Sequence, residues 1–196
     1  MNKVGIFGGS FNPVHKGHTD LARAVFKMLK LNEMLIIPTA QSPHKAMTSV
    51  SFEDRMEMCR IAFRDDKSFS VSDIEGKLGG TSYTINTVRA LKEIYSKDTE
   101  FYLIIGGDML FYFDKWYRHE ALLKECHVVA AARENDSYAD MLECANELGR
   151  VKVLNLPVTE VSSTELREKI AKGEDVGEML DEQVKKFISE RGFYRD

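Results

Sequence analysis

Six short apolar runs, rich in β-branched and aromatic residues, alternate along this chain with segments whose apolar residues repeat at the helical period. Most of the runs are continuously apolar, which is typical of strands that are covered on both faces. The predicted strands are Val4–Phe7, Met34–Ile37, Phe69–Ile74, Phe101–Ile105, His127–Ala132 and Val151–Leu156. Residues 69–74 alternate more than the others, so we expect that strand to lie nearer an edge of the sheet.

The segments between these strands predict helices. They are the stripe Leu21–Leu29, the segment that follows a Ser51 cap, the stripe Ile85–Ile94, the run from His119 to Cys126, Tyr138–Leu148, Ser163–Ala171 and a last helix that ends at Arg191. Strands and helices in alternation indicate an α/β fold with a doubly wound, mainly parallel sheet and C-terminal helices. The 196 residues suit one domain, 1–196. Ligands of such sheets bind at the carboxyl ends of the strands, so the informative residues should directly follow strands.

Composition narrows the classes of partner. A net charge of −4 disfavours nucleic-acid binding through the phosphate backbone, although a small anion could still occupy a local basic pocket. The three cysteines form no C-x-x-C pair, so neither a disulfide framework nor a structural zinc site is indicated. The sequence shows no signal-peptide pattern and no apolar run long enough to cross a bilayer. We therefore expect a cytoplasmic protein without a membrane or nucleic-acid partner.

The stretch "GIFGGSFNPVHKGH", residues 5–18, lies where the first strand should become the first helix. Backbone N–H groups and the helix dipole make such a junction an anion site. Gly8 and Gly9 allow the backbone to approach a ligand closely. His15 and His18, three residues apart and with His18 expected to begin the helix, are therefore predicted to donate hydrogen bonds to phosphate oxygens. A capping turn with two incidental histidines is the simpler alternative.

Three better-known motifs do not fit this stretch. A Walker loop needs Gly-Lys-Ser/Thr, whereas the order here is Lys16-Gly17-His18. The dinucleotide fingerprint G-x-G-x-x-G is not supplied by "GIFGGS". A zinc protease would show H-E-x-x-H rather than H-x-G-H.

A second candidate anion motif, "VSSTELRE", occupies residues 161–168. Ser162 and Glu165 fit a capping box, which places Ser163 and Thr164 in the first helical turn. Arg167 would follow one turn later on the same face. The hydroxyls, the free N–H groups and the guanidinium could thus meet one anion. An ordinary helix cap with a solvated arginine remains the alternative.

The string "GGSFNPVHKGH" resembles the signature of the nucleotidylyltransferase superfamily, whose T/H-x-G-H motif binds nucleoside triphosphate phosphates. These enzymes resemble class I aminoacyl-tRNA synthetases in their core, but this chain is too short for a synthetase and lacks the K-M-S-K-S loop. Their second motif usually reads Ile-Ser-Ser-Thr/Ser-x-x-Arg, and Val161 is a mild departure from it. The resemblance implies His15, His18 and Arg167 as catalytic residues. The implied ATP contacts are Gly8, Gly9, Ser10, Phe11, His15, His18, Gly106, Asp108, Arg133, Ser162, Ser163, Thr164 and Arg167.

Four further stretches resemble the bacterial nicotinate-nucleotide adenylyltransferases. They are "SPHK" at 42–45, "GGTSYTINT" at 79–87, "IIGGDML…DKW" at 104–116 and "AAR" at 131–133. In that family the tryptophan, here Trp116, stacks on the nicotinate ring, and backbone N–H groups near Thr84 and Tyr117 meet the carboxylate. The implied acceptor-binding residues are His44, Lys45, Tyr83, Thr84, Trp116 and Tyr117.

From the residues alone, simpler interpretations of these positions stay open. Trp116 could be a core tryptophan, Lys45 a solvated loop lysine and Arg133 a surface arginine. Asp108 suits either an acceptor for a ribose hydroxyl or a helix N-cap.

The resemblance implies transfer of AMP from ATP to nicotinate mononucleotide, with Mg²⁺ bound mainly through the ATP phosphates and without a dedicated metal cage. The partners are then ATP and nicotinate mononucleotide, and the sequence leaves a homo-oligomer open. The rivals are adenylylation of nicotinamide mononucleotide or phosphopantetheine, a non-enzymatic ATP sensor and a flavodoxin-like structural module. The fold alone does not separate them.

Overall fold

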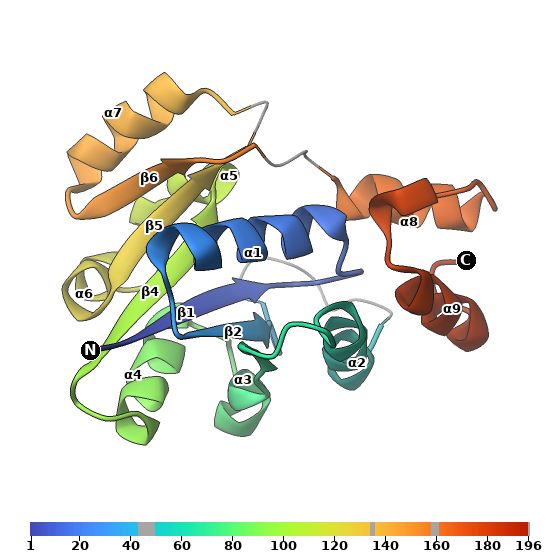
Figure 1. Cartoon of the computed structure of the whole chain (residues 1–196), viewed down its shortest axis with the longest axis horizontal. Coiled ribbons are helices and arrows are strands. Elements are labelled where there is room, and N and C mark those ends of the chain that lie inside the picture. The colour runs from blue at the N-terminus through green and yellow to red at the C-terminus, as the bar shows by residue number, and fades with distance from the viewer. Residues whose placement is uncertain (43–49, 134–135, 158–160, 196) are drawn as a thin grey trace.

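The computed structural model describes residues 1–42, 50–133, 136–157 and 161–195. Its centre is a six-stranded sheet of order β3-β2-β1-β4-β5-β6, in which each neighbouring pair is parallel (Figure 1). The strands are β1 (Asn2–Gly9), β2 (Glu33–Pro38), β3 (Phe69–Val71), β4 (Thr99–Gly106), β5 (His127–Ala132) and β6 (Val151–Asn155). The predicted α/β fold with a mainly parallel sheet is confirmed.

Strand β3 differs from its prediction. It lies at the sheet edge as expected but ends at Val71, because Asp73 caps a short helix that begins at Ile74. The prediction of a strand as far as Ile74 was therefore wrong: Ile74 is buried as a helical residue rather than as part of the alternating strand.

The predicted helices are present, some with shifted ends. The helices are α1 (Lys16–Leu29), α2 (Phe52–Ala62), α3 (Ile74–Leu78), α4 (Thr84–Ile94), α5 (Gly107–Leu110), α6 (His119–Glu125), α7 (Tyr138–Leu148), α8 (Ser163–Ala171) and α9 (Glu182–Arg191), with 3-10 turns η1 (Phe113–Lys115) and η2 (Gly177–Met179). The elements α3, α5, η1 and η2 were not predicted, because they are too short to show a helical period. Ile94, expected in an apolar stripe, is 72% exposed at the end of α4.

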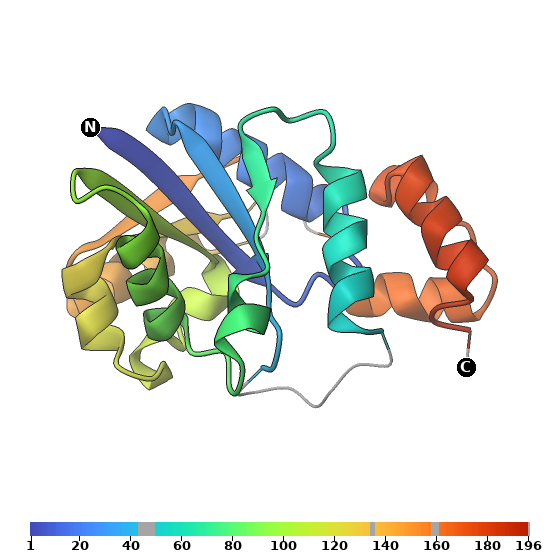
Figure 2. The same cartoon turned by 90° about the horizontal axis from the view of Figure 1, so that it is seen from below.

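Alternate residues of the central strands feed two apolar cores, one on each face of the sheet. Phe7 of β1 belongs to the core that contains residues of α1, α2, α8 and α9. Its neighbour Ile6 belongs to the core that contains residues of α4, α6 and α7. Figure 2 shows α9 beside α2, with α8 and α9 together at one end of the molecule. Burial on both faces explains why most strand sequences are continuously apolar.

The chain runs outward from β1 through β2 to β3, then returns to place β4 on the other side of β1. The strand order therefore reverses between β1 and β4, where open α/β sheets bind their ligands. Phe7 is level with Ile104, so β1 and β4 end close together at Gly9 and Gly106. This edge of the sheet positions the site described next.

Candidate functional site

In the β1–α1 loop, the aromatic ring of Phe11 packs closely against the backbone at Gly9. A Cβ atom on Gly9 would lie 3.1 Å from the ring of Phe11, so a larger residue would have to displace that ring. Phe11 itself is 1% exposed and has a φ of 45°, and its ring centroid lies 5.0 Å from that of His18. A ligand would therefore meet the backbone of Phe11 rather than its side chain.

The two histidines of the motif stack on each other. Their ring centroids are 3.6 Å apart with an interplanar angle of 25°. The helix begins at Lys16, with His15 as its N-cap, so the expectation that His18 begins it was wrong: His18 is the third helical residue. From there its Nδ1 accepts a hydrogen bond from the backbone N–H of His15 at 3.3 Å. A neutral His18 must then carry its proton on Nε2, which makes Nε2–H a donor.

Both imidazoles are held in the neutral form. Burial, assisted by the positive charge of Arg133, lowers the pKa of His15 to about 4. Burial, the neighbouring His15 and Arg133 also lower the pKa of His18 well below its usual value. His15 Nδ1 is buried and has no hydrogen-bond partner among the residues that the structure describes. The two rings therefore offer a ligand a donor, His18 Nε2–H, and a buried nitrogen, His15 Nδ1, that gains a partner on binding.

Helix α8 brings the second motif onto this loop. Its N-cap is Ser162, whose hydroxyl accepts from Glu165 N at 3.4 Å, as predicted. Ser163 Oγ donates to the carbonyl of Pro13 at 3.2 Å. Arg167 donates to the carbonyl of Asn12 at 2.8 Å and to Thr164 Oγ1 at 3.1 Å. The two motifs, each predicted separately as an anion site, are thus in direct contact.

The segments that follow β4 and β5 contribute three charged side chains that lie close together, those of Arg133, Asp108 and Asp136. Arg133 lies 3.4 Å from Asp108 and 3.6 Å from Asp136, measured between guanidinium nitrogens and carboxylate oxygens. A Cβ atom on Gly106 would lie 2.7 Å from Asp108 Oδ1, so glycine allows this close approach. Gly106, not Asp108, is the N-cap of α5, and the carboxylate of Asp108 is exposed. Of the two interpretations of Asp108, the N-cap is wrong.

Three of the predicted acceptor residues, Tyr83, Trp116 and Tyr117, supply an aromatic surface at the start of α4 and directly after η1. Tyr83 precedes Thr84 at the start of α4, and its ring centroid lies 4.5 Å from that of Tyr117. Trp116 is half-buried against Phe113, with ring centroids 5.3 Å apart, so it is not a fully buried core residue. His44 and Lys45 lie outside the described residues.

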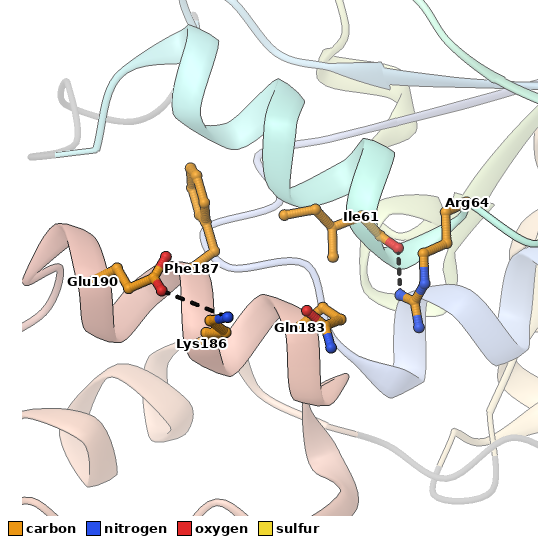
Figure 3. Close-up of a pocket in the computed structure, with 6 residues that line it drawn as sticks. All are labelled: Ile61, Arg64, Gln183, Lys186, Phe187 and Glu190. Carbon is orange, nitrogen blue, oxygen red and sulfur yellow. Dashed lines mark hydrogen bonds and ion pairs between the residues drawn. The ribbon is translucent and has the colours of Figure 1, made fainter.

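One pocket is lined in part by predicted site residues, whereas another is not. A pocket of about 150 Å³ adjoins the start of α4 and includes Glu75, Ser82, Tyr83 and Thr87 in its lining. A larger hollow of about 280 Å³ lies between α2 and α9 (Figure 3). It is lined by Ile61, Arg64, Gln183, Lys186, Phe187 and Glu190, none of which was predicted as a site residue. Size alone therefore does not locate the site.

Sequence analysis missed three residues that support the site. Arg55 donates to the carbonyls of Ser10 and Thr39, at 2.8 and 2.7 Å. Tyr194 donates to Asn12 Oδ1 at 2.6 Å, and burial raises the pKa of its phenol. The third, Glu75, is a buried carboxylate of α3. Their partners are distant in sequence. For Arg55 and Glu75 the available signal was a charged residue on an apolar helix face, whereas Tyr194 follows the end of α9 and gave no such signal.

Metal-ligand clusters and membrane-spanning helices are both absent from the described residues. Within them, no three or more His, Cys, Asp or Glu side chains are grouped as metal ligands would be. None of the helices in the same residues is both long and apolar enough to span a bilayer.

Comparison with known proteins places these features in a family. Residues 6–169 match the model of the cytidylyltransferase-like family. A "probable nicotinate-nucleotide adenylyltransferase" of Lachnoclostridium phytofermentans is 38% identical over 99% of this chain and 100% of its own length. Its counterpart in Thermotoga maritima is 35% identical, over 95% and 91%. A nicotinic acid mononucleotide adenylyltransferase of Plasmodium falciparum, solved with NaAD, superposes with a TM-score of 0.84 at 19% identity, over 99% and 98%. At that identity, the solved structure supports the fold.

Proposed function

The chain belongs to the cytidylyltransferase-like family and, within it, to the nicotinate-nucleotide adenylyltransferases, and we propose that it transfers AMP from ATP to nicotinate mononucleotide. The products are nicotinic acid adenine dinucleotide (deamido-NAD) and pyrophosphate, so the reaction is a step of NAD biosynthesis. One observation carries the proposal beyond family membership: α8 and the β1–α1 loop converge at the switch point of the sheet, beside an aromatic surface.

In this reaction the 5′-phosphate of nicotinate mononucleotide is already an anionic nucleophile, so no covalent enzyme intermediate is needed. The enzyme has to align two anions and stabilise the charge that develops on the α-phosphate and on the departing pyrophosphate. His15 and His18 would donate to the transferring phosphoryl group. Arg167, which is anchored to the carbonyl of Asn12 and has further N–H groups, would bind the β- and γ-phosphates. Ser163 would join it through its backbone N–H, or by turning its hydroxyl away from the carbonyl of Pro13.

The histidines begin this reaction uncharged. A bound triphosphate would favour their protonated forms, opposing the effect of burial and of Arg133. Each imidazole could then bind as a neutral donor and gain charge as phosphate charge builds up. The fixed cations Arg133 and Arg167 would supply the attraction before that change.

The acceptor would bind on the aromatic surface of Tyr83, Trp116 and Tyr117. Trp116 offers a half-buried π face for the pyridine ring. The N–H groups near Thr84 and Tyr117 would meet the carboxylate of nicotinate. Asp108, exposed beside Arg133, would accept a ribose hydroxyl of ATP.

Mg²⁺ would enter with ATP and be held mainly by phosphate oxygens. The described side chains near the phosphate motifs fit this arrangement, since they are histidines, hydroxyls and arginines that favour phosphate rather than a carboxylate cage. When bound, the ion would neutralise phosphate charge. We further propose that residues 1–196 act as one domain and that the enzyme works in the cytoplasm, in keeping with its free cysteines.

The test is pyrophosphate release from Mg·ATP with nicotinate mononucleotide, nicotinamide mononucleotide and phosphopantetheine as alternative acceptors. We expect kcat/KM to favour the nicotinate acceptor by about 10-fold or more, which is about 1.4 kcal/mol. Equal rates with both pyridines would indicate dual specificity. Activity only with phosphopantetheine would contradict the role of Trp116. ATP binding without turnover of any acceptor would favour a sensor.

A further inference from the structure

Two charged side chains outside the predicted site are buried close to it. Arg55 of α2 is 5% exposed, and Glu75 of α3 is 8% exposed. Burying a charge is costly unless hydrogen bonds or an opposite charge compensate for it. Each residue lies within the electrostatic influence of the other. Their hydrogen bonds show what this arrangement holds together.

Arg55 connects the carboxyl ends of two neighbouring strands. Its Nη1 donates to the carbonyl of Ser10, in the loop after β1, and its Nη2 donates to the carbonyl of Thr39, after β2. Thr39 N in turn donates to the carbonyl of Gly9 at 2.8 Å. The guanidinium therefore fixes the phosphate loop of the first motif to the segment that leaves β2.

Glu75 extends this connection from Ala40, the residue after Thr39, to α4. One carboxylate oxygen accepts from Ala40 N at 3.2 Å, and the other accepts from Thr87 Oγ1 of α4 at 3.1 Å. Thr87 is itself 2% exposed. The carboxylate therefore fixes the segment after β2 to the helix that begins at Thr84.

Two more hydrogen bonds join the segment after β2 to the segment before α4. Ser82 N donates to the carbonyl of Gln41 at 2.9 Å, and Gln41 N donates to Ser82 Oγ at 3.1 Å. Ser82 directly precedes Tyr83, the N-cap of α4. An unbroken series of contacts thus runs from Ser10 to the start of α4.

We propose that Arg55 and Glu75 are positioning residues that fix the phosphate loop and the acceptor-binding segment relative to each other, through Thr39 and Ala40. The inference rests on the proposed function, which identifies the segment around Tyr83 and Thr84 as acceptor-binding. In-line transfer requires the two substrates to be held in register, and a displacement of about 1 Å can cost about 100-fold in rate. Neither residue needs to contact a substrate to have this effect.

The test measures kcat and both KM values, with Glu75→Gln as the main variant. The amide keeps the shape of the side chain but loses the negative charge that faces Arg55, and its NH2 group cannot accept from Thr87 Oγ1, so the hydroxyl has to reverse its role to keep that contact. We expect the KM for nicotinate mononucleotide to rise about 5- to 10-fold while the KM for ATP stays within about 2-fold. Glu125→Gln, on the surface and paired with Arg89, is the matched control.

Two more variants test the two halves of the connection. Thr87→Val removes one hydrogen bond to Glu75 without changing the shape much, and we expect about a 3-fold rise in the acceptor KM alone. It also serves if Glu75→Gln does not fold. Arg55→Lys keeps the charge but loses the forked geometry, and we expect it to raise both KM values and lower kcat, together about 10-fold or more in kcat/KM. Arg60→Lys, on an exposed face of α2, is its control.

The outcomes separate this inference from the proposed function. A wild-type enzyme that does not use nicotinate mononucleotide overturns both. An active wild type whose Glu75→Gln and Thr87→Val variants keep the normal acceptor KM overturns the positioning role alone. Equal rises in both KM values for Glu75→Gln, together with a lower melting temperature, would show a merely structural carboxylate and would also overturn it. A rise confined to the acceptor KM supports the role.

Discussion

The phosphate side and the acceptor side of the site are built differently. On the phosphate side, His15 is 6% exposed and Arg167 is already hydrogen-bonded to the loop that it supports. On the acceptor side, Tyr117 is 48% exposed and Trp116 is half-buried. The side chains of the phosphate side are held in place without substrate. The acceptor side instead presents aromatic rings that are half-buried or exposed.

This difference follows from what each side has to recognise. Phosphate charge is stabilised best by donors that are fixed in advance, because they do not have to reorganise during the reaction. A pyridine ring needs a broad apolar face, which an exposed aromatic residue supplies at little cost in order. Mutations on the phosphate side should therefore affect the chemical step, and mutations on the acceptor side should affect substrate affinity.

The largest effect is expected from His18→Ala. Removing one donor to the developing charge should lower kcat about 1,000-fold, with the folded state retained. Steady-state pyrophosphate release and circular dichroism would measure both quantities. His127→Ala, on an exposed part of β5, is the control. Near-normal turnover of His18→Ala would contradict the assigned role and remove the distinction between the two sides.

Arg167→Ala should follow, with a loss of about 100-fold in kcat/KM for ATP, since a fixed cation and two hydrogen bonds disappear. The KM for nicotinate mononucleotide should change much less. Lys169→Ala is the control within α8, because Lys169 pairs with Glu165, one turn earlier in the same helix. Equal losses for both substrates would mean that Arg167 supports the whole site rather than the phosphate side.

The buried histidines should also make stability depend on pH. The pKa of His15 is about 4 in the folded state against 6.5 when unfolded, so between these values the unfolded state binds a proton that the folded state does not. The neutral form of His15 should therefore make its full contribution to stability above pH 6.5. Below that value the free energy of unfolding should fall as the pH drops towards 4. At pH 5 the free energy of unfolding should have lost about 2 kcal/mol because of His15 alone.

Urea denaturation at pH 7.5 and pH 5 would measure this dependence. His15→Gln should lose about 2 kcal/mol less than the wild type on acidification, whereas His127→Gln should behave as the wild type does. If His15→Gln were equally sensitive to acid, the imidazole would not be held neutral in the folded enzyme.

The smallest of these effects is expected from Trp116→Ala. Loss of the stacking face should raise the KM for nicotinate mononucleotide about 10-fold while kcat and the KM for ATP change little. Tyr138→Ala, an exposed aromatic residue of α7, provides the comparison. A large fall in kcat would show that the acceptor side takes part in aligning the reaction, and the contrast between the two sides would weaken.

The two sides also differ in how far the sequence predicts them. The period of apolar residues predicted α7 and α8 with their observed bounds, since both are amphipathic helices that start at a serine cap. Each phosphate motif was predicted separately, because each follows from local chemistry at a helix start, whereas the contact between the two was not predicted. Asp108 was ambiguous, because α5 has only four residues and shows no period.

Arg55, Glu75 and Tyr194 escaped prediction for a different reason. Their partners include backbone groups and side chains that come close only after the sheet has formed. A charged residue on an apolar helix face shows that something compensates for the charge, but it does not show what. Such contacts depend on tertiary structure, and local pattern carries no information about the partner.

The loop contacts at Asn12 have a consequence for how the enzyme is made. Asn12 is among the first residues to leave the ribosome, yet its carbonyl is bound by Arg167, 155 positions later, and its side chain by Tyr194, 182 positions later. Synthesis proceeds at about 5–20 residues per second, so these two partners follow Asn12 by roughly 8 to 36 seconds. A nascent chain that stops before residue 194 would have Arg167 but lack the hydrogen bond from Tyr194, so the loop obtains its full support only once residue 194 has been made.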